Sequence, residues 1–228
     1  MRITNLKTNH IENPLGFALG QPRLSWKVED AKGKFQKAAR VEVAADADFK
    51  KILFDSGKDK KADNLAFVPD IKLEPYTRYY WRVKVWTDAG EKETSETAWF
   101  ETAKMEDEWQ AEWITPDWED KEIHPYLRKT VSIENKIASA RIYACGLGVY
   151  ELYVNGAKVG DEVLAPGFHA YNQWLQYQTY DVTKMLNRGE NVFGAMLGNG
   201  WYKGRFGFSG SQEPVYGDTM ALICELHI

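Results

Sequence analysis

The dipeptide Asn155-Gly156 constrains the fold of this 228-residue chain more than any other feature. It directly follows residues 150–154, in which apolar and polar or mixed side chains alternate. Alternation with a period of two is the pattern of a half-buried strand. A type I′ turn needs positive φ at both central residues, and Asn-Gly is a pair that accepts this conformation readily. The sequence therefore predicts a tight hairpin that joins residues 151–154 to residues 157–159.

The same alternation recurs along the chain and predicts further strands. It appears at residues 23–29, 39–45, 79–85, 142–144 and 220–226. Residues 49–53 have helical spacing instead, but Gly57 ends whatever begins there, and a single turn satisfies the pattern. An aromatic content of 14%, with nine Trp, also suits β structure. The predicted fold class is therefore all-β, and helical bundles are not expected.

The length of the chain suits two domains of roughly 100 to 120 residues. In the first half, Tyr79 follows Pro75 and opens a strongly alternating segment, which is typical of a strand after a tyrosine corner and resembles fibronectin type III domains. The polar segment at residues 103–108 is the predicted linker. We therefore expect two antiparallel β-sandwiches, at residues 1–103 and 108–228, the first of them fibronectin type III-like.

Several classes of protein do not fit this composition. The formal net charge is −4, so no basic field for nucleic acid is expected. No apolar run reaches the roughly 18 to 20 residues of a membrane span, and the first ten residues lack the apolar core of a signal peptide. We therefore expect a cytoplasmic protein without a membrane partner. In that compartment Cys145 and Cys224 are expected to be free thiols.

The glycine-punctuated loop at residues 198–208 and the segment at residues 164–174 hold the side chains best suited to a ligand. A carbohydrate site needs flat aromatic faces for sugar C–H groups, with amide, carboxylate or guanidinium groups for the hydroxyls. The predicted sugar-binding residues are Asn199, Trp201, Tyr202, Arg205, His169, Tyr171 and Trp174, with Glu151 as a further candidate. The same rings also fit a second role, the packing of one loop over another, and the sequence favours neither.

Metal binding has weaker support in the sequence. The four histidines lie far apart and form no zinc motif, so no zinc site is expected. Hard oxygen ligands on loops suit calcium, although their spacing is not that of an EF-hand. The candidate calcium ligands are Asp161, Glu162, Asn199 and Asp218.

Three segments of the second half carry a resemblance to a known family. They are YELYVNGAKVGDEVLAPGF at residues 150–168, LQYQTYDVT at 175–183 and GENVFGAMLGNGWYKGRFGF at 189–208. Together they resemble the N-terminal β-sandwich domain of bacterial alpha-L-rhamnosidases, which are glycoside hydrolases that release terminal L-rhamnose. The resemblance covers about half of the chain. It implies that the second sandwich is a galactose-binding-like jelly roll.

The resemblance also implies where catalysis takes place. In such enzymes, which invert configuration, the catalytic acids belong to a helical barrel that follows the β domains, and the sequence shows no such helical region. Hydrolysis of a glycoside normally needs two carboxyl groups, one with a raised pKa. The candidate for such a group is Glu151, on a predicted strand beside Tyr150 and Tyr153, but the alternation favours an outward-facing strand residue there. No catalytic residue is therefore predicted in this chain.

The expected partners are the C-terminal catalytic domain of the same parent chain and a rhamnose-containing carbohydrate. The last alternating segment stops at Ile228 without a turn, which fits an N-terminal piece of a longer protein. Two alternatives remain open, a stand-alone carbohydrate-binding module and a purely structural scaffold.

Overall fold

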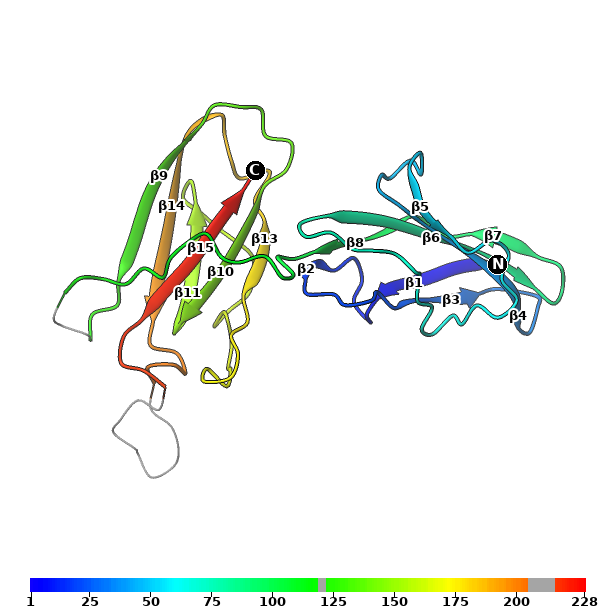
Figure 1. Ribbon diagram of the computed structural model, residues 1–228, viewed down its shortest axis with the longest axis horizontal. Helices are drawn as coiled ribbons and strands as arrows, with labels where there is room; N and C mark the ends of the chain where they lie inside the picture. The colour runs from blue at the N-terminus through cyan, green and yellow to red at the C-terminus, as the bar shows by residue number, and fades with distance from the viewer. Residues whose placement is uncertain (119–121, 205–215) are drawn as a thin grey trace, which may run out of the picture. The chain divides into compact units, whose positions relative to one another are not determined.

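The computed structural model describes residues 1–118, 122–204 and 216–228, and in these ranges the chain forms strands and turns but no helix (Figure 1). Consequently, none of the described segments is a helix of the length and apolarity needed to cross a membrane. The chain divides into two compact units, Met1–Glu108 and Trp109–Ile228. The predicted all-β fold is confirmed.

The first unit is a sandwich of two sheets. Its strands are β1 (Arg2–Thr8), β2 (Leu15–Phe17), β3 (Leu24–Glu29), β4 (Gln36–Ala44), β5 (Ile52–Asp55), β6 (Arg78–Thr87), β7 (Lys92–Thr94) and β8 (Ala98–Thr102). One sheet pairs β1 with β3, and the other has the order β2-β8-β6-β4-β5, with β7 added to β6; these strands are labelled in Figure 1. All pairs are antiparallel except β2 with β8. Side chains from both sheets fill one core.

Strand β6 shows why the alternating sequence produces this core. Its buried positions alternate with half-exposed ones along the whole strand, and Trp81, Val83 and Val85 are fully buried. Trp26 on β3 faces the same core. Burial of a side chain as large as Val stabilises the fold by about 1.5 to 3 kcal/mol, so one face of β6 contributes strongly.

The segment with helical spacing forms a turn that leads into β5. The carboxylate of Asp46 accepts hydrogen bonds from the backbone N–H groups of Asp48, Lys50 and Lys51, at 3.1, 3.1 and 2.8 Å. These local bonds satisfy the donors that a helix would otherwise use. Ile52 then begins a strand that pairs with β4. The expectation that a single turn is enough agrees with this geometry.

The second unit is also a sandwich of two sheets. Its strands are β9 (Tyr126–Ile133), β10 (Arg141–Leu147), β11 (Val149–Val154), β12 (Ala157–Lys158), β13 (Gln178–Asp181), β14 (Gly189–Gly198) and β15 (Ala221–His227). One sheet has the order β13-β10-β15 and the other β12-β11-β14-β9, and all pairs are antiparallel. A single core lies between them, with Ile142 and Leu222 from one sheet and Leu152 and Ala195 from the other.

The predicted hairpin in this unit is confirmed. Asn155 and Gly156 have φ of 52° and 84°, and the turn joins β11 to β12. The sequence did not reveal a second role of Asn155. Its Nδ2 donates to the carbonyl of Met185, and its Oδ1 accepts from the N–H of Val192, each at 2.9 Å. The turn residue thus also anchors the hairpin to the rest of the sandwich.

The predicted free thiols are confirmed, and strand register explains why they do not pair. On the β10–β15 ladder Cys224 lies opposite Ala144, one residue away from Cys145. Neighbouring residues of a strand point to opposite faces, so the two sulfur atoms lie on different sides of the sheet. Burial raises the pKa of both thiols to about 12.

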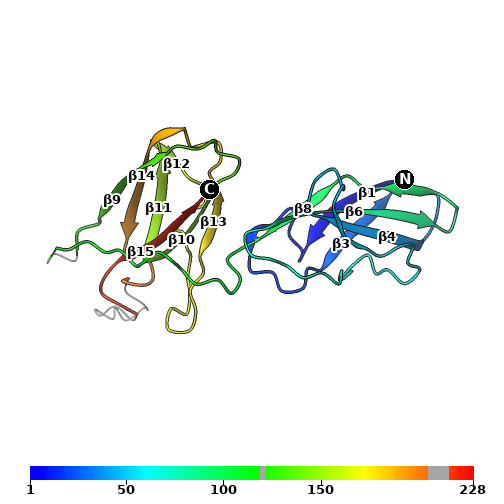
Figure 2. The ribbon, with the colours of Figure 1, turned by 45° about the horizontal axis from the view of Figure 1, so that its top comes forward.

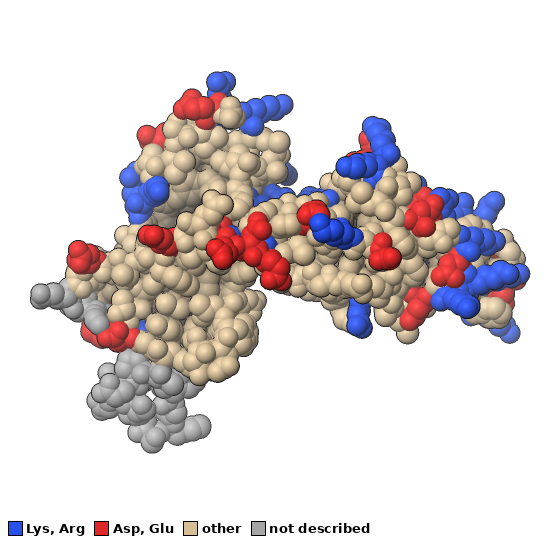
Figure 3. All heavy atoms as spheres, viewed as in Figure 1, with Lys and Arg blue, Asp and Glu red and all other residues tan. Residues whose placement is uncertain are grey.

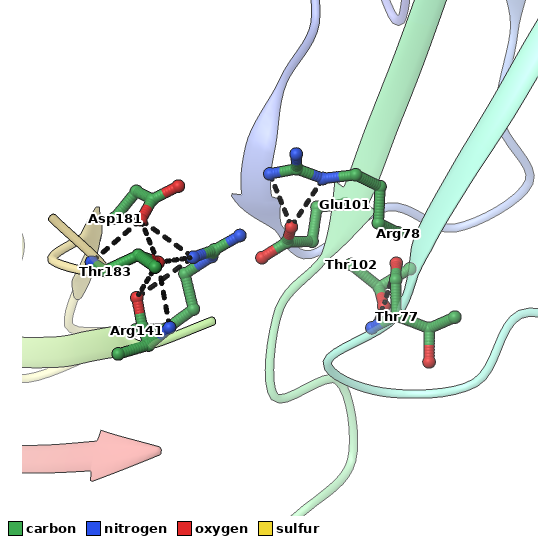
Figure 4. Close-up of polar contacts among 8 residues, drawn as sticks. Thr77, Arg78, Glu101, Thr102, Arg141, Asp181 and Thr183 are labelled. Carbon is green, nitrogen blue, oxygen red and sulfur yellow. Dashed lines mark hydrogen bonds and ion pairs between the residues drawn. The ribbon is translucent and has the colours of Figure 1, made fainter. Parts of the chain in front are cut away.

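Cross-strand ion pairs fix the register inside each unit (Figure 4). In the first unit Arg78 on β6 lies opposite Glu101 on β8, with 2.8 Å between Nη2 and Oε2. In the second unit Arg141 on β10 lies opposite Asp181 on β13, with 2.9 Å between Nη1 and Oδ1. Opposite charges at directly facing positions stabilise a sheet pair and disfavour a slipped register.

The segment predicted as a linker begins inside the first unit. Ala103 and Lys104 are buried, and the Lys104 ammonium donates to the Tyr76 hydroxyl at 3.1 Å and to the Glu108 carbonyl at 3.3 Å. A lysine in a charged run suggests a solvated linker, but here its amine is satisfied by groups of the same unit.

On the surface, acidic and basic side chains are interspersed over the face shown in Figure 3.

Candidate functional site

Two loops of the second unit that carry predicted site residues lie side by side. One runs through residues 163–177, before β13, and the other is the turn at residues 199–204, after β14. Gly148, in the turn between β10 and β11, has φ of 118°, and a Cβ there would lie 2.3 Å from the carbonyl oxygen of Gly198. The 199–204 turn is closed by a hydrogen bond from the N–H of Lys203 to the carbonyl of Asn199 at 3.1 Å.

Ring contacts join these two loops in two places, and we call the residues that make or adjoin these contacts the aromatic cluster. Its members are Phe168, His169, Tyr171, Trp174, Trp201, Tyr202 and Tyr216. Phe168 meets Trp201 edge-on at 6.4 Å between centroids, and Tyr171 meets Tyr202 in the same way at 5.3 Å. Such edge-to-face geometry is favourable between aromatic rings. The cluster brings together five predicted sugar-binding residues, whereas Phe168 and Tyr216 were not predicted.

His169 is a buried member of the aromatic cluster, and its ring contacts those of Tyr171 and Trp174. It is 1% exposed, its Nδ1 accepts from the N–H of Gln176 at 3.5 Å, and its Nε2 lies 3.2 Å from the carbonyl of Pro166. Burial lowers the pKa of His169, which favours the neutral ring. With Nδ1 as acceptor, Nε2–H is the donor to Pro166. Both nitrogens are thus used inside the loop, so this geometry gives no support to a sugar contact by His169.

Phe168 and Trp174 form the outer face of the cluster. Their exposed fractions are 54% and 53%, whereas Tyr171, Trp201 and Tyr202 are half-buried. Three aliphatic side chains of the same loop are also exposed. They are Val163, Leu164 and Leu175. The loop therefore presents an apolar and aromatic surface to its surroundings.

Asn199 adds a polar group to the same turn as Trp201. Its Oδ1 is buried and has no hydrogen-bond partner among the described residues. A buried acceptor without a partner is uncommon in native proteins, and a bound ligand or water satisfies such atoms in many sites. Lys203 is also largely buried, and its Nζ lies 3.9 Å from Oε1 of Glu122.

Glu151 is separate from the aromatic cluster in its contacts. Its two carboxylate oxygens accept from the Lys158 ammonium at 2.8 Å and from the Tyr153 hydroxyl at 2.9 Å. The hydrogen bond from Lys158, followed by that from Tyr153, lowers the pKa of Glu151. The interpretation as an outward-facing strand residue is confirmed. The predicted site residue Arg205 lies outside the described residues.

The candidate calcium ligands do not gather into a cluster of acids in the described part of the chain. No group of three or more His, Cys, Asp or Glu side chains suited to a metal occurs there. Asp161 and Glu162 are exposed neighbours after β12, and Asp218 accepts from the Thr219 hydroxyl at 2.9 Å. Calcium binding by these residues and Asn199 stays a prediction.

Two family models match the chain. The description of one is "Rha78A-like, N-terminal immunoglobulin domain", and it matches residues 3–106. The other is "Alpha-L-rhamnosidase N-terminal domain" and matches residues 135–228. The immunoglobulin and fibronectin type III folds share the sandwich architecture, so the first match agrees with the predicted kind of domain.

Individual relatives support the same assignment. A curated alpha-L-rhamnosidase of Formosa agariphila is 32% identical over 227 residues, an alignment that covers 85% of this chain and 24% of that protein. A crystal structure of native alpha-L-rhamnosidase from Aspergillus terreus is 31% identical, with a TM-score of 0.89. A structure of alpha-L-rhamnosidase from Dictyoglumus thermophilum is 32% identical, with a TM-score of 0.83. Each structural match covers 99% of this chain and 27% of the other. This chain spans about a quarter of the length of the curated relatives it matches. With both of its units accounted for in this way, the chain belongs to the alpha-L-rhamnosidase family and matches the N-terminal region of its members.

Proposed function

We propose that the parent protein hydrolyses terminal alpha-L-rhamnose from glycosides and that residues 1–228 are a non-catalytic part that supports its catalytic region. The relatives that align over most of this chain are named alpha-L-rhamnosidases and are about four times longer. Their additional length leaves room for a separate catalytic region. On this proposal, the two sandwiches described here hold that region in place.

Four carboxyl groups of this chain have pKa values unsuited to general-acid catalysis. A glycosidase needs a carboxylic acid with a raised pKa to protonate the leaving group. The pKa values of Asp46, Asp55, Glu91 and Glu151 are all lowered, in each case mainly by a hydrogen bond. The main donors are the backbone N–H of Lys50, the Arg40 side chain, the backbone N–H of Gly33 and the Lys158 side chain. Such groups stay ionised and are poor general acids.

The observation that carries the proposed contact is the exposed outer face of the aromatic cluster. Phe168 and Trp174 are more than half exposed, on the same loop as three exposed aliphatic side chains. Exposed large apolar side chains gathered on one loop in this way are typical of a surface that contacts another protein. We therefore propose that the catalytic region of the parent covers this loop.

A second candidate function is contact with a rhamnose-containing carbohydrate. The specific observation in its favour is the combination of Trp201 and Tyr202 with the amide oxygen of Asn199, which is buried and has no hydrogen-bond partner within the described ranges. Ring faces suit sugar C–H groups, and an amide oxygen accepts from a hydroxyl. On this alternative, sugar rather than protein covers the cluster.

A comparison of Trp174→Ala in the parent and in residues 1–228 distinguishes the two. If protein covers the cluster, the variant lowers the melting temperature of the parent more than that of the shorter chain. Trp113→Ala is the matched control, because Trp113 is also exposed but makes no ring contact in the described chain. If sugar covers the cluster, Trp174→Ala changes the melting temperatures of the parent and of residues 1–228 equally. Trp174→Ala or Trp201→Ala then weakens rhamnose binding measured by calorimetry. Equal responses without rhamnose binding would contradict both.

A further inference from the structure

The core of the second unit is open on one side. A groove of about 680 Å³ lies between its two sheets, and residues of the segment 110–114 form part of its wall. Ile142, Leu152 and Leu222 line this groove although each is at most 6% exposed. Its floor is therefore the hydrophobic core itself. Leu127 and Leu226 also line the groove and are only partly buried, so further cover would remove more apolar surface from water.

One side of the groove is bounded by a strand with an unpaired edge. Within the described residues, β9 pairs with β14 over its full length, from Tyr126 opposite Met196 to Ile133 opposite Gly189, and with no other strand. Figures 1 and 2 show β9 at the outer edge of its sheet. The backbone N–H and C=O groups on its free side are a template for another strand.

The opposite side of the groove is already occupied. Ile114 and Leu222 exchange two backbone hydrogen bonds of 2.9 Å, and the Glu225 carboxylate accepts from the N–H groups of Gln110 and Ala111. The segment 110–115 thus covers part of the edge of β15. An additional strand would consequently pair with β9 rather than with β15.

The charges of the groove restrict what can fill it. Lys129 lies between Leu127 and Val131 on β9, at a position whose neighbours two residues away face the core, yet it is exposed and makes no ion pair in the described chain. The other charged residues of the lining are Arg128 and Glu112, so the β9 side is basic. Two copies joined through the middle of β9 would place two Lys129 side chains together, and like charges across a strand pair are destabilising.

We propose that an extended segment from the remainder of the parent chain adds to β9 as a further strand and closes this groove. The segment has apolar residues that alternate toward Leu127 and Val131, and a carboxylate that meets Lys129. The proposal rests on the parent being longer than this chain, as the lengths of its relatives indicate. It is independent of whether the aromatic cluster contacts protein or sugar.

Amide hydrogen exchange of β9 in the parent and in residues 1–228 tests this directly. We expect the free-edge amides of β9 to exchange about tenfold or more slowly in the parent, because strand addition hydrogen-bonds them. Val131→Asp, which places a charge in the groove, should abolish most of that protection in the parent. Thr130→Asp is the control, since Thr130 is exposed on the same strand and does not line the groove.

Two other outcomes would overturn the proposal. Equal exchange rates of the β9 amides in the parent and in residues 1–228 would mean that no further strand pairs with β9. Lys129 would then serve only to disfavour pairing at an exposed edge. Protection in residues 1–228 that rises with protein concentration would mean that a second copy fills the groove. If Val131→Asp unfolds the parent, Lys129→Glu provides the second test: it should weaken the protection of β9, and unchanged protection would count against the predicted carboxylate. Loss of rhamnosidase activity is not a readout here, so failure of the proposed function and failure of this inference are distinguishable.

Discussion

The backbone N–H of Glu74 donates a 2.7 Å hydrogen bond to the hydroxyl oxygen of Tyr79, whose side chain is 2% exposed. The bond ties the chain before β6 to the first buried position of that strand. It also confirms the tyrosine corner predicted from the sequence. The Tyr79 ring stacks on Phe100 of β8 at 5.1 Å, so the corner joins a backbone bond to the core.

Tyr79→Phe should lower the free energy of unfolding by about 1 kcal/mol and leave the chain folded, because one buried hydrogen bond is lost while the ring contacts stay. Denaturant unfolding followed by fluorescence measures the change. Tyr80→Phe is the matched control, since Tyr80 is half-exposed on the other face of β6. An equal loss in both variants would show that the corner has no special role.

Gly156→Val should cost about 1 kcal/mol or more, because a β-branched residue is poorly tolerated at positive φ. A side chain at this position would have no neighbour within 4 Å, so the backbone conformation alone accounts for the effect. Gly20→Val is the control, since Gly20 also has open space but no positive φ. The hairpin interpretation fails if the denaturation midpoint is unmoved by the change at Gly156.

The carboxylate of Asp46 predicts a pH dependence of stability. Hydrogen bonds from the backbone N–H groups of Lys50 and Lys51 lower its pKa in the folded state. The folded chain therefore holds this proton less tightly than the unfolded chain, so the stabilisation is present above the unfolded pKa and is lost as the pH falls through the folded pKa.

Asp46→Asn should consequently destabilise the chain at pH 6, and the difference from the native sequence should shrink below about pH 4. Thermal unfolding across this range measures it. Asp48→Asn is a suitable control, since the Asp48 carboxylate pairs with the exposed ammonium of Lys50 and accepts no backbone hydrogen bond from the residues that the structure describes. A difference that stays constant down to pH 2 would contradict the assigned role of Asp46.

Strands with one buried face could be predicted from the sequence. In β6 and β11 buried positions alternate with half-exposed ones, and this leaves a period of two in the residues themselves. The turn at Asn155-Gly156 could be predicted in the same way, because the need for positive φ concerns only the two central residues of the turn. Features that depend only on neighbouring residues were thus accessible without the structure.

Long-range contacts were not accessible in this way. The contact between Tyr171 and Tyr202 joins two loops distant in the sequence, and no periodicity records it. The pairing of Ile114 with Leu222 is a single bridge between an irregular segment and a strand. The sequence placed Lys104 in a linker and did not show that its side chain is buried. That burial depends on a hydrogen bond to the Tyr76 hydroxyl, which only the fold brings close. The candidate site could therefore be located on its loops, but not assembled from them.

The most direct test of the account is an assay of alpha-L-rhamnoside hydrolysis with the full-length parent and with residues 1–228, at equal molar concentration and with the same chromogenic rhamnoside. We expect the parent to release the aglycone and the shorter, folded chain to release none above background. Hydrolysis by residues 1–228, or a folded parent without activity on any alpha-L-rhamnoside, would contradict the assignment of this chain as the non-catalytic region of such an enzyme.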